Sequence, residues 1–385
     1  MESRIKKTYN YINENINKLA QKSDLFTQIT ILIVGLIIFL LVLWIIRLIL
    51  LQKDLLNCIN LNKLYNKNNT FISSFAPNGN IVHQDYEYQL FDYYIKSAYN
   101  CCLPGEPTNS FVSACALQTC IRQGYRLLDF EIYSVNEIPV ISTSSEKDFR
   151  LKETYNYLEF DKAMETISSF AFSSHCPNNH DPLLLHFRIM TNHKDILDKM
   201  ALSIVNHLSS RLLGPEFGYE NNGVNLGTIW LKRFVGKIII IIDKSNPIYI
   251  DSKLDELVNI TSNSIFMRLY RNQQLMTGSA GQDLITYNKE NMTIVLPELS
   301  RTYNNFNPND AFNLGCQLVA MNIQNYDKYL QYYNQLFDDN NSAFVLKPPQ
   351  LRGTPPKVTV IDPPNPLLKQ TPKTTNLPTG HSVTF

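Results

Sequence analysis

Two carboxylates at a spacing of two mark the stretch GYRLLDFEIYSVNEIPVIST, which spans residues 124–143. The stretch has the pattern of a strand, a turn and a second strand, and Asp129 and Glu131 fall in the first of these strands. Successive side chains of a strand point to opposite faces, so the two acids share one face among apolar neighbours. Carboxylates gathered in this way are typical ligands of hard cations such as calcium.

The elements that must position these acids alternate between short apolar runs and longer amphipathic ones. Helices between strands indicate a parallel sheet with helical crossovers, and about eight strands over about 260 residues indicate a closed (β/α)8 barrel of the TIM type. We therefore predict an α/β barrel. Strands are expected at residues 127–132, 139–142, 183–189, 237–242, 264–269, 292–296, 318–322 and 344–346, and helices at 111–123, 160–172, 194–213 and 327–337.

Length, charge and cysteine content limit the classes of protein to which the chain can belong. Its 385 residues have room for a membrane segment and such a barrel, and a formal net charge of +1 gives no indication of a nucleic-acid partner. No CxxC pair occurs, so no zinc site is expected, and an odd number of cysteines argues against a complete disulfide framework. We interpret the cysteines as ordinary, partly buried thiols, at positions Cys58, Cys101, Cys102, Cys115, Cys120, Cys176 and Cys316.

An uncharged apolar run near the N-terminus predicts a membrane anchor. Residues 25–46, LFTQITILIVGLIIFLLVLWII, are long enough to cross the hydrocarbon core of a bilayer as a helix. Trp44 and Arg47 stand where an interfacial belt would lie. A cleaved signal peptide would have a shorter apolar region followed by a small-residue cleavage site, and a buried core helix would not be apolar on all faces. We therefore favour an uncleaved single-pass anchor.

The side of the membrane that carries the barrel is not determined by the sequence. Five Lys or Arg residues precede the apolar run and four follow it by residue 67, so the positive-inside rule gives almost no preference. Asn-x-Ser/Thr sequons begin at Asn68, Asn259, Asn291 and Asn340, but an Asn-rich chain produces such sequons by chance.

Composition divides the chain into five parts. We expect a polar N-terminal arm at residues 1–24, a transmembrane helix at 25–51, an irregular connector at 52–87 and the barrel at 88–352. Residues 353–385 are rich in Pro and Thr, and we expect them to form a disordered tail.

Two blocks resemble the barrel of the phosphoinositide-specific phospholipases C. The first contains YYIKSAYN and GYRLLDFEIYSVNEIPVIST, and it resembles the X region of that family over residues 88–245. The second contains LPELSRTYNNFNPNDAFNLGCQLVAMNIQN and AFVLKPPQLR, and it resembles the Y region over residues 262–352. The resemblance implies a TIM-like barrel that cleaves the phosphodiester of phosphatidylinositol lipids, in lipid metabolism and signal transduction. Two histidines act there as acid and base, and a calcium ion held by carboxylates and an asparagine activates the attacking hydroxyl.

The resemblance assigns several positions of the catalytic centre, and the histidines are missing from it. Asn100 matches the calcium-binding asparagine, whereas Tyr99 and Thr143 stand where the two catalytic histidines belong. Asp129 and Glu131 match the family's Glu-x-Asp pair with the two acids exchanged. Neither tyrosine nor threonine titrates near neutral pH, and losing one acid–base group typically lowers the rate by about 10² to 10⁴.

The remaining positions concern the metal and the lipid headgroup. Arg188, on the strand PLLLHFRI, occupies the position of the last calcium-binding glutamate. If the barrel places Arg188 inside, it is expected to point toward the two acids and to balance their charge without a metal. The resemblance further implies that Arg301 grips the headgroup phosphate, that Phe306 replaces the tyrosine that stacks on the inositol ring, and that Lys244 is retained from a phosphate-binding strand.

Three hypotheses follow from these substitutions. The first is a membrane-anchored barrel that has lost hydrolysis and calcium binding, has no cofactor, and binds an anionic headgroup through Asn100, Arg188, Lys244, Arg301 and Phe306. The second is an active, metal-free phosphodiesterase in which Arg188 acts as electrophile and a histidine has been recruited. The third is a purely structural membrane protein, for example of a large DNA virus with an AT-rich genome. Candidates for the recruited histidine are His186, His193 and His83, and the loop SSHCPNNHD holds His175 and His180 as a weak metal-binding pair.

Overall fold

The structure is a computed structural model that describes residues 2–67, 69–71, 73–74, 87–147, 152–276, 281–353, 374–376, 378 and 380–384. The chain divides into two units, Met1–Arg352 and Gly353–Phe385. His83, Asn68, part of the predicted connector and most of the predicted tail lie outside the described residues.

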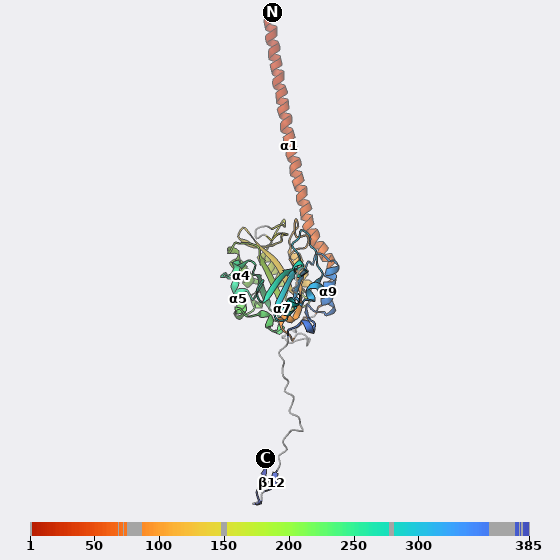
Figure 1. Ribbon diagram of the computed structural model, residues 1–385. Helices are drawn as coiled ribbons and strands as arrows, with labels where there is room; N and C mark the ends of the chain where they lie inside the picture. Colours follow the sequence, from red (N-terminus) through yellow and green to blue (C-terminus); the bar gives the residue numbers. More distant parts are fainter. Residues whose placement is uncertain are drawn as a thin grey trace. The chain divides into compact units, whose positions relative to one another are not determined.

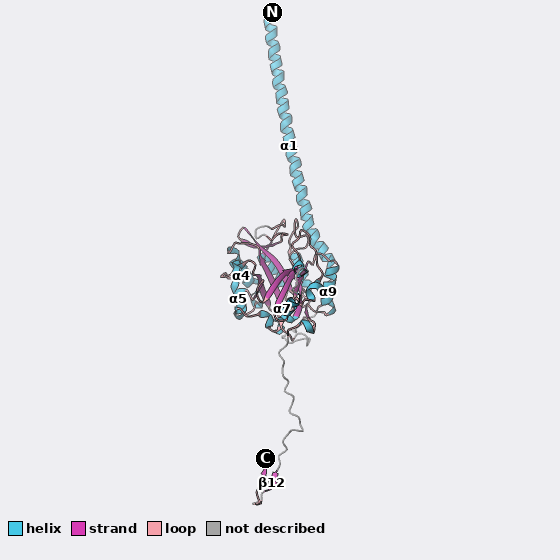
Figure 2. Cartoon of the chain, viewed as in Figure 1, coloured by secondary structure: helices cyan, strands magenta, loops and turns pink. Residues whose placement is uncertain are grey.

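One long helix, α1 (Glu2–Leu64), forms the N-terminal part of the chain (Figures 1 and 2). It is long and apolar enough to cross a membrane, and its apolar side chains between residues 25 and 49 are exposed. Leucine and isoleucine dominate this run, and no proline interrupts it. The prediction of an irregular connector is wrong for residues 52–64, because the helix continues through them.

A parallel barrel follows, and it confirms the predicted fold class. In the described part of the chain its strands run in the order β7-β6-β5-β2-β1-β10-β9-β8, all neighbours parallel, and no ladder joins β7 to β8, so the barrel is nearly closed. The strands are β1 (Tyr93–Ala98), β2 (Leu127–Val135), β5 (Leu183–Ile189), β6 (Ile238–Asp243), β7 (Ile260–Ser262), β8 (Met267–Arg271), β9 (Met292–Leu296) and β10 (Leu318–Met321).

Two of the predicted strands lie off this path. β3 (Ile138–Ser142) pairs antiparallel with β2 and with the short β4 (Leu158–Glu159). β11 (Phe344–Leu346) pairs antiparallel with β1. Their places in the barrel are taken by β1 and β7, which are absent from the strands expected on apolar pattern.

Helices surround the strands, as Figure 2 shows. Their apolar faces are buried against the barrel, whose own core includes the continuous Ile run of β6. Such uninterrupted apolar strands are typical of parallel sheets that are covered on both faces. The helices are α2 (Ala114–Arg122), α3 (Phe160–Phe170), α4 (Asp195–Leu208), α5 (Gly218–Asn222, which contains left-handed residues), α6 (Asn272–Met276), α7 (Gly281–Asn288), α8 (Pro308–Phe312) and α9 (Lys328–Asp339).

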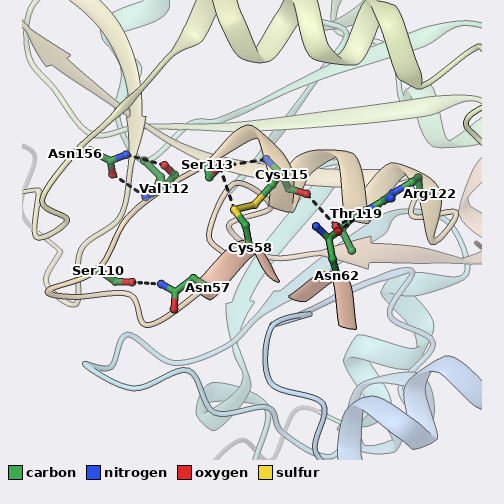
Figure 3. The surroundings of a disulfide bond; sticks show 10 residues. All are labelled: Asn57, Cys58, Asn62, Ser110, Val112, Ser113, Cys115, Thr119, Arg122 and Asn156. Atoms are coloured by element: carbon green, nitrogen blue, oxygen red, sulfur yellow. Dashed lines mark hydrogen bonds between the residues drawn. A yellow bond between two sulfur atoms is a disulfide. The ribbon is translucent and has the colours of Figure 1, made fainter. Parts of the chain in front are cut away.

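The cysteine and tail predictions need correction. Cys58 and Cys115 form a disulfide with a Cα–Cα distance of 6.1 Å, so they are not the free thiols that we expected (Figure 3). The other cysteines are free and buried, including Cys316, whose packing role was predicted. In the second unit, β12 (Thr374–Asn376) pairs antiparallel with β13 (Ser382–Thr384), so the expectation of disorder is wrong for these segments.

Candidate functional site

The register between β2 and β5 brings the two acids of the opening motif against two basic side chains. Asp129 pairs with His186, and Glu131 pairs with Arg188. Because both pairs share one face of their strands, all four side chains lie on the same side of the sheet and are buried. The expected proximity of Arg188 to both acids is therefore present in the fold.

Arg188 binds three neighbours at once. Its Nε and Nη2 donate to the two carboxylate oxygens of Asp129 at 2.9 and 2.7 Å, in the bidentate arrangement that guanidinium geometry favours. Nη1 donates to Glu131 Oε1 at 2.6 Å, and Nη2 also donates to Asn100 Oδ1 at 2.7 Å. We call Asn100, Asp129, Glu131 and Arg188 the acid–arginine cluster.

Electrostatics favour the charged form of this cluster. Burial alone would raise the pKa of Asp129, but the guanidinium of Arg188 and the hydrogen bond from His186 hold that pKa well below its usual range. Burial alone would lower the pKa of Arg188, and the two carboxylates raise it instead. Glu131 accepts two further hydrogen bonds on Oε2, from the Tyr133 hydroxyl at 3.1 Å and the Ser144 N–H at 3.0 Å.

His186, the leading candidate for a recruited catalytic base, is held in the barrel interior. Its Nδ1 lies 2.7 Å from Asp129 Oδ1, and its Nε2 lies 2.9 Å from Ser262 Oγ. The side chain has no exposed surface. Both ring nitrogens thus contact protein groups. His186 lies two residues before Arg188 on β5 and therefore farther from the carboxyl end of the strand.

The two positions that replace the family's histidines have different surroundings. The Tyr99 ring lies between two guanidinium groups, 4.8 Å from that of Arg188 and 5.7 Å from that of Arg271. Its hydroxyl accepts a hydrogen bond from Arg271 Nη1 at 3.2 Å. Thr143 is buried, and its hydroxyl donates to the carbonyl oxygen of Pro107 at 2.7 Å. The partners in these contacts are arginine guanidinium groups and a backbone carbonyl, neither of which acts as a proton shuttle near neutral pH.

A pocket of about 300 Å³ opens at the carboxyl ends of β5, β6, β8 and β9, and we call it the mouth pocket. In a TIM barrel this end carries the active site. Arg188 is part of its lining, together with Arg271 and Lys147, while Asp243 is the acidic lining residue. The other lining residues are Ile189, Met190, Ser245, Asn246, Asn263, Leu269, Gln274, Leu296 and Leu299.

Four of the five predicted headgroup ligands do not line the mouth pocket, and one of these, Asn100, belongs to the acid–arginine cluster. The Lys244 ammonium group binds the carboxylate of Glu220 at 2.9 and 3.1 Å, beside a neighbouring hollow lined in part by Arg268. Arg301 is exposed, and its carbonyl oxygen accepts a weak hydrogen bond from Thr108. Phe306 is only 8% exposed and belongs to the hydrophobic core.

Sequence reasoning missed two of the three cations at the mouth. Arg271 is the last residue of β8, where its Nη1 also donates to the carbonyl oxygen of Pro297 at 2.5 Å. Lys147 follows the β3 strand and is exposed. The available signal was position alone, since a charged residue at the carboxyl end of a barrel strand faces the mouth.

None of the remaining described histidines lines the mouth pocket. His175 contacts Ser173, His180 is bound through its N–H to Ser73, and His193 is exposed. Among the described residues, no group of three or more His, Cys, Asp or Glu side chains could hold a metal ion.

Comparison with known proteins connects the C-terminal half of the barrel to one family. The family described as phosphatidylinositol-specific phospholipase C, Y domain, matches residues 251–350. The chain is 36% identical to human 1-phosphatidylinositol 4,5-bisphosphate phosphodiesterase eta-1 over 97 residues, which are 24% of this chain and 6% of that protein. It is 38% identical to the zeta-1 enzyme of Bos taurus over 79 residues, which are 20% of this chain and 12% of that protein. The matched stretch is thus a small part of these relatives' length.

Solved structures extend the likeness to the whole barrel. The crystal structure of L. pealei PLC21 superposes with a TM-score of 0.58 at 20% identity, over 69% of this chain and 38% of that one. The S. officinalis PLC21 structure gives the same TM-score at 21% identity and the same coverage. At this identity the structures establish a shared fold. With the sequence match over residues 251–350, this fold makes the chain a phosphoinositide phospholipase C-like protein.

Proposed function

We propose that this chain is a membrane-anchored phospholipase C-like barrel that no longer hydrolyses phosphoinositides and binds an anionic headgroup at its mouth. The observation that carries the proposal is the acid–arginine cluster. Arg188 donates to both carboxylates and to the Asn100 amide oxygen at 2.6 to 2.9 Å. These are the oxygens that the resemblance assigns to calcium.

The residues present do not fit a calcium ion. Calcium takes six to eight oxygen ligands and favours several negative charges. Here the guanidinium of Arg188 already neutralises one carboxylate charge. It also binds the oxygens of Asp129 and Glu131 that a calcium ion would need. A calcium ion is therefore not expected to bind at this site.

Among the described residues, no histidine lines the mouth pocket as a candidate for proton transfer. Cleavage needs a base for the attacking hydroxyl and an acid for the leaving group, and each must reach its proton within about 3.2 Å or through one water. Tyr99 and Thr143 stand at the two positions concerned, and His186 has both nitrogens engaged in the interior. These contacts favour the degenerate protein over the active, metal-free phosphodiesterase.

Charge and shape support binding of an anion. Arg271 and Lys147 line the mouth pocket against one acid, Asp243, so the lining residues carry a positive formal charge even when Arg188 is counted as neutralised by Asp129. Its volume of about 300 Å³ is at the lower end of small-molecule sites. The curated relatives are phosphodiesterases of 1-phosphatidylinositol 4,5-bisphosphate, which makes an inositol phosphate headgroup the ligand class that we propose.

The experiment uses the full chain in bilayer nanodiscs. No inositol phosphate release is expected from phosphatidylinositol or its bisphosphate, with calcium or with chelator, and neither addition is expected to shift the thermal unfolding midpoint. Soluble inositol trisphosphate is expected to bind, and Arg271→Gln is expected to weaken that binding about tenfold, the effect of losing about 1.4 kcal/mol. Arg268→Gln, three residues earlier on β8 and outside the mouth pocket, is the matched control.

Each arm has a contrary result. Release of inositol phosphate in chelator would establish the active phosphodiesterase instead. A calcium-dependent rise of the unfolding midpoint would show that the cluster still holds the ion. Equal binding by both variants and the wild type would remove the headgroup from the proposal and leave a structural role.

A further inference from the structure

The end of α1 is covalently joined to the barrel. The disulfide connects Cys58 on α1 with Cys115 in the first turn of α2, across 57 residues of chain (Figure 3). Sequence analysis did not foresee this bond, because the two cysteines are distant in the chain and the total number is odd.

Polar contacts beside the disulfide fix the same segment. Asn57 Nδ2 donates to Ser110 Oγ at 3.2 Å, and Arg122 Nη2 donates to Asn62 Oδ1 at 2.7 Å, as Figure 3 shows. The Leu61 side chain is 3% exposed and belongs to the barrel's hydrophobic core. The last turns of α1 are therefore part of the folded barrel rather than a free linker.

The position of the bond along α1 relates it to the membrane. The predicted transmembrane segment ends at residue 51. Cys58 follows seven residues later on the same helix, about 10 Å farther at 1.5 Å per residue. If α1 spans a bilayer, the disulfide and the barrel lie on the same side, just beyond the interface.

The bond needs an oxidising compartment. When it forms, the two thiols lose two protons and two electrons to the disulfide of a thiol oxidoreductase, which is reduced to a dithiol. Disulfides form and persist in the secretory lumen and on cell or particle surfaces, whereas cytosolic thiols are kept reduced. The five other cysteines, all in described parts of the chain, are buried, so the folded barrel exposes no free thiol to such an environment.

One sequon is placed to be modified there. Of the three sequons whose asparagine the structure describes, Asn259 is buried and Asn291 precedes the buried residues Met292 and Thr293 of β9. Asn340 is exposed at the end of α9, as is the following Asn341. Of these three asparagines Asn340 is the most exposed, and its amide nitrogen donates to the carbonyl oxygen of Leu336 at 2.7 Å.

We propose that the barrel lies on the oxidising, lumenal or external side of the membrane and carries an N-linked glycan at Asn340. The Asn340 amide nitrogen forms a bond to the first sugar and loses a proton, while the bond from that sugar to a lipid-diphosphate donor breaks. The N-terminal arm then lies in the cytosol, an orientation that the nearly equal numbers of Lys and Arg residues on the two sides of the anchor permit. The inference rests on the membrane anchor of the proposed function and is independent of headgroup binding.

Synthesis of the full chain with sealed microsomes tests the side. Alkaline carbonate should leave the protein in the membrane pellet, and added protease should spare the barrel until detergent opens the vesicles. Endoglycosidase should increase the mobility of the wild type. Asn340→Gln should carry one glycan fewer than the wild type, and Asn291→Gln, at a partly exposed asparagine followed by the buried Met292 and Thr293, should match the wild type.

Counting thiols tests the bond in the same preparation. After acid quenching and denaturation, a maleimide is expected to label five cysteines without reductant and seven with it. Cys58→Ser and Cys115→Ser should each show six labelled cysteines without reductant. Agreement would support the oxidising location.

The contrary results separate this inference from the anchor. A barrel that is digested in intact vesicles, in protein that carbonate does not extract, would place it in the cytosol and overturn the inference alone. Extraction by carbonate would instead remove the anchor of the proposed function, and this inference with it. Seven labelled thiols without reductant, or equal glycan content in Asn340→Gln and the wild type, would also overturn it.

Discussion

Two buried arginines lie at opposite ends of the same barrel strands, and they are held in different ways. Arg188, near the carboxyl end of β5, donates to Asp129, Glu131 and Asn100. Arg126, immediately before β2, donates instead to the carbonyl oxygens of Ala171 and Asn178 and to the Cys176 sulfur. Its Nε has no hydrogen-bond partner among the described residues. The mouth is thus a set of ion pairs, whereas the direct hydrogen-bond acceptors of Arg126 at the opposite end are neutral groups.

The aspartates beside these arginines differ accordingly. Burial raises the pKa of Asp181 to about 6, and neither Arg126 nor the Ser74 N–H, which donates to it at 2.5 Å, reverses that shift. Asp129 is equally buried, yet direct bonds from Arg188 and His186 lower its pKa. Direct contact with a guanidinium thus distinguishes Asp129, whose pKa is lowered, from the equally buried Asp181, whose pKa is raised.

The largest expected effect comes from removing the cation at the mouth. Arg188→Met leaves two buried carboxylates without their partner, and breaking a buried pair in this way costs about 3–5 kcal/mol of unfolding free energy. Urea denaturation at pH 7 measures it. Arg126→Met is the matched variant at the other end, where only hydrogen bonds to neutral acceptors are lost, and about 1–3 kcal/mol is expected.

Neutralising the acids provides the control. In the Arg188→Met background, Asp129→Asn together with Glu131→Gln should recover most of the lost free energy, because no unpaired charge stays buried. Equal losses in the two arginine variants, or a triple variant no more stable than Arg188→Met, would contradict the distinction between the two ends.

The next effect is a pH dependence produced by Asp181. A carboxyl whose pKa is raised on folding, here from 3.8 to about 6, favours the folded state most when it is protonated. Its contribution is therefore complete below pH 3.8 and is lost as the pH rises through about 6, by roughly 3 kcal/mol at most. Asp181→Asn should gain unfolding free energy relative to the wild type across that window.

The slope of this difference, rather than its offset, is the measurement, since the substitution also changes the bonds with Ser74 and Asn178. Asp161→Asn serves as the control of opposite sign. Hydrogen bonding from Ser203 and His207 lowers the pKa of Asp161, so its contribution is lost as the pH falls. A wild-type minus Asp181→Asn difference that is flat from pH 4 to pH 6 would show that Asp181 ionises normally.

The sequence predicted the acid–arginine cluster better than it predicted the other residues that line the mouth pocket. Strand periodicity placed Asp129 and Glu131 on one face, and alternation on PLLLHFRI placed Arg188 with His186, so the cluster followed once the strands were paired. The alternation of strands and helices along the sequence likewise predicted the barrel. β1 and β7 were not, because YYIKSA holds a buried lysine and ITS is only three residues long.

What sequence could not supply was contact between segments that are distant in the chain. Arg271 reaches Tyr99 across 172 residues, and Cys58 reaches Cys115 across 57. Lys244 lies one residue beyond β6, where Glu220, on a left-handed turn, binds it, and it does not line the mouth pocket. Such outcomes depend on loop conformations that local pattern does not encode.

The smallest effect is expected at the ion pair between Lys244 and Glu220. The ammonium of Lys244 lies 2.9 Å from Glu220, with side chains 39% and 26% exposed, and solvent-accessible pairs contribute less than about 1 kcal/mol. Lys244→Met should therefore change urea stability little and leave the binding of inositol trisphosphate at the wild-type affinity. A tenfold loss of affinity in Lys244→Met, at unchanged stability, would return Lys244 to the headgroup site that the sequence resemblance implied. It would also require Glu220 to release the lysine on binding.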